Sequence, residues 1–68
     1  MNVATLKPGD LVGVEYARDL EVHSKGIYLC KLIRIDHEDG CAEVLEVNTS
    51  RREDVLIRNI RDAKQATL

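Results

Sequence analysis

Apolar and polar positions alternate along several stretches of the chain. In the first stretch, residues 11–16 (LVGVEY), Val12 and Val14 fall on one side and Gly13 and Glu15 on the other. A period of two is typical of a half-buried strand, and a Pro-Gly turn signal precedes it. We therefore expect a first strand with Val12 and Val14 facing the core.

The strongest strand pattern covers residues 27–36 (IYLCKLIRID). Alternation places three of its side chains on one face: Tyr28, Cys30 and Leu32. Ile33 and Ile35 fall on the other face, so the strand either bends or is buried on both sides partway along. A long, curved strand is what a small barrel requires.

Two connections flank this strand. Residues 37–40 (HEDG) contain Asp-Gly between alternating runs, which predicts a hairpin to a return strand over residues 41–47. Residues 17–25 (ARDLEVHSK) show no clear period. We expect them to form a surface loop or a short additional hairpin strand.

The C-terminal third allows two readings. Ser50 and Glu53 match a capping box, and apolar residues recur at helical spacing, so residues 51–64 could form one helix on a three-stranded sheet. However, residues 55–57 (VLI) are consecutive apolar positions, as in a short buried strand, and a helix would leave exposed sheet edges. We favour the strand; one helical turn near residues 59–62 fits either reading.

Composition is consistent with strands. The hydrophobic fraction is 44%, but there is no Phe or Trp and there are only two Tyr, so Val, Leu and Ile must fill the interior. At 68 residues the chain is expected to be one domain, with residues 64–68 as a polar tail. We predict an all-β fold, a small SH3-like barrel of about five antiparallel strands, with the three-stranded sheet and C-terminal helix as the alternative.

The net charge argues against a dedicated DNA or RNA binder, because the chain has 10 basic and 12 acidic residues. Basic residues are nevertheless frequent in residues 51–68. Arg52, Arg58 and Arg61 could align on one face and contact phosphate, although interleaved acidic residues favour intramolecular pairing. Nucleic-acid contact through this C-terminal arginine edge is therefore the alternative function.

The two cysteines, Cys30 and Cys41, both lie in apolar or strand-like runs. The first residues, MNVATLKPGD, resemble no secretory signal, so we expect a cytoplasmic protein with two buried thiols and no disulfide. No apolar run has the length of a membrane span, so no membrane partner is expected.

Catalysis, metals and cofactors find no support in the motifs. His23 and His37 do not combine with the cysteines in any zinc-finger spacing. No Ser-His-Asp set, phosphate-binding loop or placed carboxylate pair is evident. We expect a protein that is not an enzyme and has no metal site or cofactor.

Several short segments resemble the Tudor domain. They are Gly9-Asp10 followed by the alternating residues to Tyr16, then residues 28–32 (YLCKL), Ile35-Asp36, residues 52–55 (REDV) and residues 57–61 (IRNIR). The resemblance spans residues 7–63 and implies an SH3-like barrel. In Tudor domains that read methylated Arg or Lys, four aromatic rings form a cage around the cation.

The resemblance implies a binding face with an incomplete cage. Tyr16 and Tyr28 stand where the first two cage aromatics would lie, whereas Glu46 and Thr49 stand where the other two rings belong. Two rings on one wall do not enclose a methylammonium. We therefore expect a non-catalytic binding or adaptor module that recognises protein, or associates with itself as a homo-oligomer, through the face around Tyr16, Tyr28 and Glu46.

Overall fold

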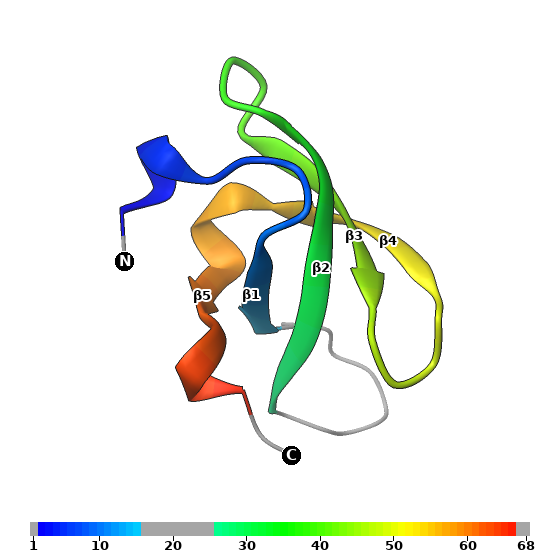
Figure 1. Ribbon diagram of the computed structural model, residues 1–68. Helices are drawn as coiled ribbons and strands as arrows, with labels where there is room; N and C mark the ends of the chain where they lie inside the picture. The colour runs from blue at the N-terminus through cyan, green and yellow to red at the C-terminus, as the bar shows by residue number, and fades with distance from the viewer. Residues whose placement is uncertain (1, 16–25, 67–68) are drawn as a thin grey trace.

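The computed structural model describes residues 2–15 and 26–66, which form one antiparallel sheet in the order β4-β3-β2-β1-β5 (Figure 1). Its strands are β1 (Leu11–Glu15), β2 (Ile27–Asp36), β3 (Cys41–Glu46), β4 (Arg52–Leu56) and β5 (Ile60–Asp62). Three 3-10 turns accompany them: η1 (Val3–Thr5), η2 (Ile57–Asn59) and η3 (Ala63–Gln65). The prediction of an all-β fold of about five antiparallel strands is confirmed. Tyr16 and the predicted loop over residues 17–25 lie outside the described residues.

The long second strand joins the two halves of the sheet. Its first part pairs with β1 and its second part with β3, and the register with β3 shifts between Leu32 and Arg34. A register shift that leaves Ile33 unpaired is typical of a β-bulge and bends the strand, which is one of the two outcomes that its pattern allowed. The bulge also returns Ile35 to the inner face, where it packs against the core. The expectation that Ile35 lies on the face opposite Cys30 is therefore wrong.

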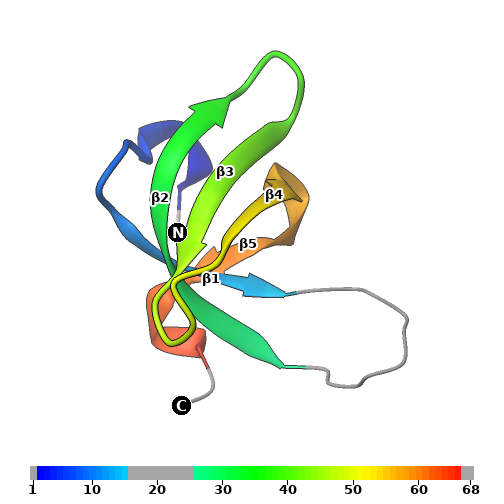
Figure 2. The ribbon, with the colours of Figure 1, turned by 90° about the vertical axis from the view of Figure 1, so that its right-hand side faces the viewer.

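The sheet is bent, as Figure 2 shows, and a single core lies on its inner face. Its buried residues come from all five strands: Val12, Val14, Cys30, Leu32, Ala42, Val44, Val55 and Ile60. The inward orientation predicted for Val12 and Val14 is confirmed, since both are 0% exposed. The edge strands β4 and β5 do not pair with each other, so hydrogen bonds leave the sheet open.

The predicted hairpin between β2 and β3 is present. Its four-residue turn covers residues 37–40, and the Gly40 N–H donates to the Asp36 carbonyl at 2.9 Å. The Asp36 carboxylate accepts hydrogen bonds from the N–H groups of Glu38 at 3.0 Å and Asp39 at 3.2 Å. Gly40 has a φ of 74°, a conformation that glycine adopts without steric cost.

The alternative of a helix over residues 51–64 is wrong. The structure has β4, the 3-10 turn η2 and β5 in this segment. Ser50, the expected cap, instead has a φ of 61° and donates its N–H to the Glu46 carbonyl. Two short strands allow both Val55 and Ile60 to enter the core, on opposite edges of the sheet.

The two cysteines differ in exposure. No disulfide joins them; Cys30 is buried as predicted, whereas Cys41 is exposed, so the expectation of two buried thiols is wrong for Cys41. Cys41 is paired with Asp36 and Leu56 at the turn end of β3, on the outer face of the sheet. Among the described residues, no helix has the length and apolar character needed to cross a membrane.

Candidate functional site

Glu46 ends β3 on the inner face of the sheet. Its cross-strand partner on β2 is the fully buried Cys30, and Glu46 itself is 8% exposed. The Glu46 N–H donates to the Arg51 carbonyl at 2.8 Å, which holds the end of β3 against the chain entering β4. The strand register therefore places the charged side chain of Glu46 on the inner face, where the other buried side chains are apolar.

The turn from β3 to β4 is built around Glu46. The Thr49 hydroxyl donates to Glu46 Oε1 at 2.9 Å, and the Ser50 N–H donates to the Glu46 carbonyl at 2.8 Å. The Arg51 N–H completes the turn by donating to Thr49 Oγ1 at 3.3 Å. Glu46 and Thr49, expected together at the binding face, are thus in direct contact.

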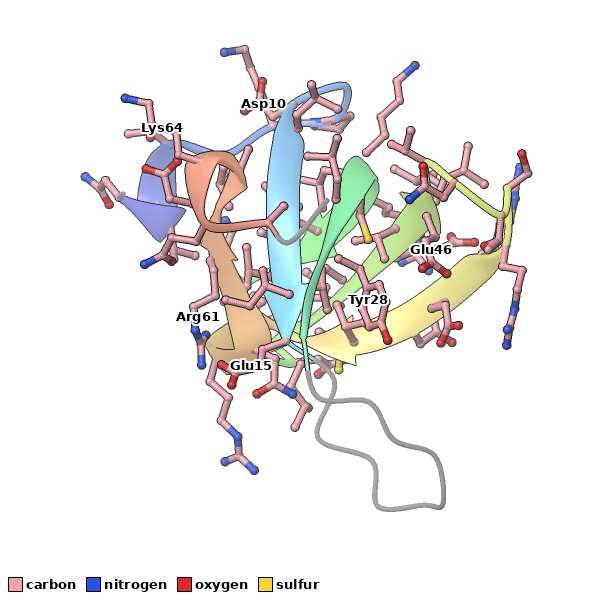
Figure 3. The ribbon with its side chains drawn as sticks, turned by 90° about the horizontal axis from the view of Figure 1, so that it is seen from below. Asp10, Glu15, Tyr28, Glu46, Arg61 and Lys64 are labelled. Atoms are coloured by element: carbon pink, nitrogen blue, oxygen red, sulfur yellow. The ribbon has the colours of Figure 1, made fainter. Side chains whose placement is uncertain are left out.

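Tyr28 lies on the same inner face of β2 as Cys30, opposite Val14 of β1. It is half-buried and packs against the core. Seen from below, Tyr28 and Glu46 lie on one side of β1, whereas Arg61 and Glu15 meet on the other (Figure 3). The structure therefore groups Tyr28, Glu46 and Thr49 at one end of the inner face.

The carboxylate of Glu46 has an unusual environment for a buried charge. Ion pairs in residues 2–15 and 26–66 involve other acidic side chains, namely Glu15, Glu43 and Glu53. Within those ranges Glu46 has no cationic partner, and Thr49 is its side-chain hydrogen-bond donor. An ionised carboxylate accepts about four hydrogen bonds, so Glu46 keeps capacity for further donors.

The three arginines of the predicted basic edge are distributed over separate elements. Arg52 lies on β4 and Arg61 on β5, at opposite ends of the strand order, with Arg58 in the turn between them. Arg52 pairs with Glu43 at 3.4 Å, and Arg61 pairs with Glu15 at 2.9 Å. Both arginines therefore form intramolecular ion pairs as expected, but with acidic residues of β3 and β1 and not with the acidic residues interleaved with them in sequence.

Sequence reasoning missed Ser50 as part of the turn that positions the site. Its φ of 61° is rare for a residue other than glycine, and it aligns the Ser50 N–H with the Glu46 carbonyl. The polar run Asn48-Thr49-Ser50 between two strand patterns was the available signal. Across the described part of the chain, no group of three or more His, Cys, Asp or Glu side chains could hold a metal ion.

Comparisons with known proteins give no relative from which a role could be transferred. No family model, no curated protein and no solved structure matches this chain.

Proposed function

We propose that this protein is a non-catalytic binding module that recognises a basic segment of a partner protein. The binding face comprises Tyr28, Glu46 and Thr49; Tyr16, which the sequence assigned to the same face, lies outside the described residues. The buried carboxylate of Glu46, which is 8% exposed and lacks a cationic partner within the described residues, carries this proposal.

We further propose that the scaffold is a small SH3-like barrel. The long β2 strand with its bulge at Ile33 supports this, because barrel closure needs a strand that curves from one half of the sheet into the other. The strand order, with the first and fifth strands paired, also supports it. In such a barrel Tyr28 and Glu46 would line one open end.

The ligand class follows from the chemistry of Glu46. Removing a carboxylate from water costs several kcal/mol unless donors replace the lost hydration. A Lys or Arg side chain would supply both charge and N–H donors, and charge-assisted hydrogen bonds are roughly twice as strong as neutral ones. The nearby Tyr28 ring would attract the same cation through its face.

The charge of this site favours basic protein segments over nucleic acid. A phosphate approaching Glu46 would be repelled, and Arg52 and Arg61 are already engaged by Glu43 and Glu15. An unmethylated lysine is also preferred over trimethyllysine, because the trimethylated group has no N–H to donate to the carboxylate. This preference for unmethylated lysine is the reverse of the preference expected for an aromatic cage.

The test is an amide chemical-shift titration with lysine-rich, trimethyllysine and acidic peptides of equal length. We expect the lysine peptide to shift the amides of Tyr28, Glu46 and Thr49, and the acidic peptide to leave them unchanged. Glu46→Gln removes the charge but keeps an oxygen to accept from Thr49. It should weaken binding by about tenfold or more, corresponding to about 1.4 kcal/mol.

Glu38→Gln is the matched control, because Glu38 is exposed in the β2–β3 turn, away from this end of the inner face. It should bind the lysine peptide as the parent chain does. Equal binding by Glu46→Gln would contradict the role of the carboxylate. Shifts at these amides that grow with protein concentration alone would instead indicate self-association through the same face.

A further inference from the structure

The edge strand β4 has a side with which no strand of residues 2–15 or 26–66 pairs. The Glu46 N–H donates to the Arg51 carbonyl, and the Ile57 N–H donates to the Gly40 carbonyl, so odd-numbered residues direct their main-chain groups toward β3. Successive residues of a strand direct these groups to opposite sides. Those of Arg52, Asp54 and Leu56 therefore point away from β3, toward the open edge.

On this edge, the negative charge of Asp54 is not compensated by a neighbouring positive charge of the described residues. Asp54 lies directly opposite Glu43 of β3, a like-charged pair that is unfavourable across strands. Arg34 and Arg52 both form ion pairs with Glu43, at 3.5 and 3.4 Å. Asp54 has no ion-pair partner among residues 2–15 and 26–66, although it is exposed.

We propose that β4 pairs antiparallel with β4 of a second copy of this chain. The register that we assign places Arg52 of each copy opposite Asp54 of the other, on the outer face. Both residues direct their main-chain groups to the open edge, so each Arg52–Asp54 pair would exchange N–H to carbonyl hydrogen bonds. One sheet would then continue through both copies around a two-fold axis.

Charge complementarity selects this register. Shifting the second copy in one direction puts Asp54 opposite Asp54, and shifting it in the other puts Arg52 opposite Arg52. On the inner face the chosen register brings the two Glu53 side chains together at the axis. Arg51 already pairs with Glu53 at 3.4 Å, and Arg51 of the second copy would approach it diagonally.

This inference concerns a different surface from the peptide-binding face and does not depend on it. One short strand from each copy buries little surface, so the dimer should be weak and dependent on protein concentration. Its exposed charge pairs should also make it weaken as salt is raised. The second copy completes the outer edge of the sheet without using Tyr28 or Glu46.

The decisive experiment mixes two oppositely charged variants in sedimentation equilibrium over a concentration series. In Arg52→Asp, position 52 would face Asp54 of the second copy; in Asp54→Arg, position 54 would face Arg52. Each variant alone should associate at least about tenfold more weakly than the parent chain. In an equimolar mixture both pairs become complementary, so association should recover to near the parent level.

Circular dichroism verifies that each variant is folded. If Arg52→Asp proves unstable, Asp54→Arg alone still tests the interface, because an arginine at position 54 is a favourable neighbour for Glu43 within the same chain. Lys7→Asp is the control, because Lys7 is exposed and lies before β1. It should dimerise as the parent does, and so should Glu46→Gln, which separates this proposal from peptide binding. A monomeric parent at all concentrations, parent-like single variants or a mixture no stronger than its components would each overturn the proposal.

Discussion

The two edges of the sheet are protected to different degrees. On the open side of β5 no strand of the described residues pairs, but Arg61 Nη1 donates to the carbonyls of Arg58 at 2.6 Å and Ile60 at 3.2 Å. The strand has only three residues, and the following turn, η3, contacts β1 and β2. On β4, five residues end the sheet without comparable cover in the described chain. A very short edge strand is a recognised defence against unwanted pairing. Of the two edges, β5 is the short one, and Arg61 also occupies carbonyl oxygens of β5 and of the turn before it.

The largest effect is expected from removing the residue that anchors the protected edge. Ile60 is the buried side chain of β5 and is 4% exposed. Ile60→Ala should lower the free energy of unfolding by about 2–5 kcal/mol, because it leaves a cavity beneath a strand of minimal length. Urea denaturation followed by circular dichroism measures this loss.

Val55→Ala provides the comparison on the open edge. Val55 is 9% exposed and anchors β4, which also has a five-residue ladder with β3. Valine loses fewer carbons than isoleucine, so the destabilisation should be smaller. A larger loss for Val55→Ala than for Ile60→Ala would show that β4, not β5, depends more on its core anchor.

A second prediction concerns the close approach between β1 and its neighbours. A Cβ at Gly13 would lie 2.7 Å from Ile27 Cγ2 and 3.0 Å from the Asp62 carbonyl of β5. Gly13→Ala should therefore destabilise the fold by about 1–3 kcal/mol through overpacking. Hydrogen exchange should show the loss of protection at β5 amides, with the β4 amides less affected.

The double variant Gly13→Ala/Ile27→Ala distinguishes the two contacts. Removing Cγ2 of Ile27 relieves the closer clash, so the double variant should lose less stability than the sum of the two single losses. Simple additivity would mean that Ile27 moves aside without cost and that the contact with the Asp62 carbonyl dominates.

The long strands could be predicted because alternation is a local signal. Residues 11–15 and 27–36 each show it, and the bend in β2 was implied by apolar side chains on both faces around Ile33. The position of β5 could not be predicted in the same way. Ile60–Asp62 contains one buried side chain, and one apolar residue defines no period. Its pairing with β1 is a long-range contact that local pattern does not encode.

The site could be predicted only in part. The resemblance to the Tudor domain assigned Glu46 and Thr49 to the same binding face, and in the structure the Thr49 hydroxyl donates a hydrogen bond to Glu46. The burial of Glu46 could not be read from the sequence, because a glutamate at a strand end is usually exposed. Its burial depends on the register that sets it opposite Cys30. Register likewise decides that Cys41, in an equally strand-like run, is exposed.

The smallest expected effect tests what Arg61 contributes to the protected edge. Its ion pair with Glu15 is partly exposed, at 34% and 50% for the two side chains, so Arg61→Ala should cost only about 0.2–1 kcal/mol of stability. Arg61→Lys keeps the charge but lacks the planar fork that reaches the Arg58 and Ile60 carbonyls. If covering these carbonyls protects β5, the lysine variant should exchange its β5 amides as fast as the alanine variant does. If the ion pair alone matters, the lysine variant should match the parent, and raising the salt concentration should remove the difference between the parent and Arg61→Ala.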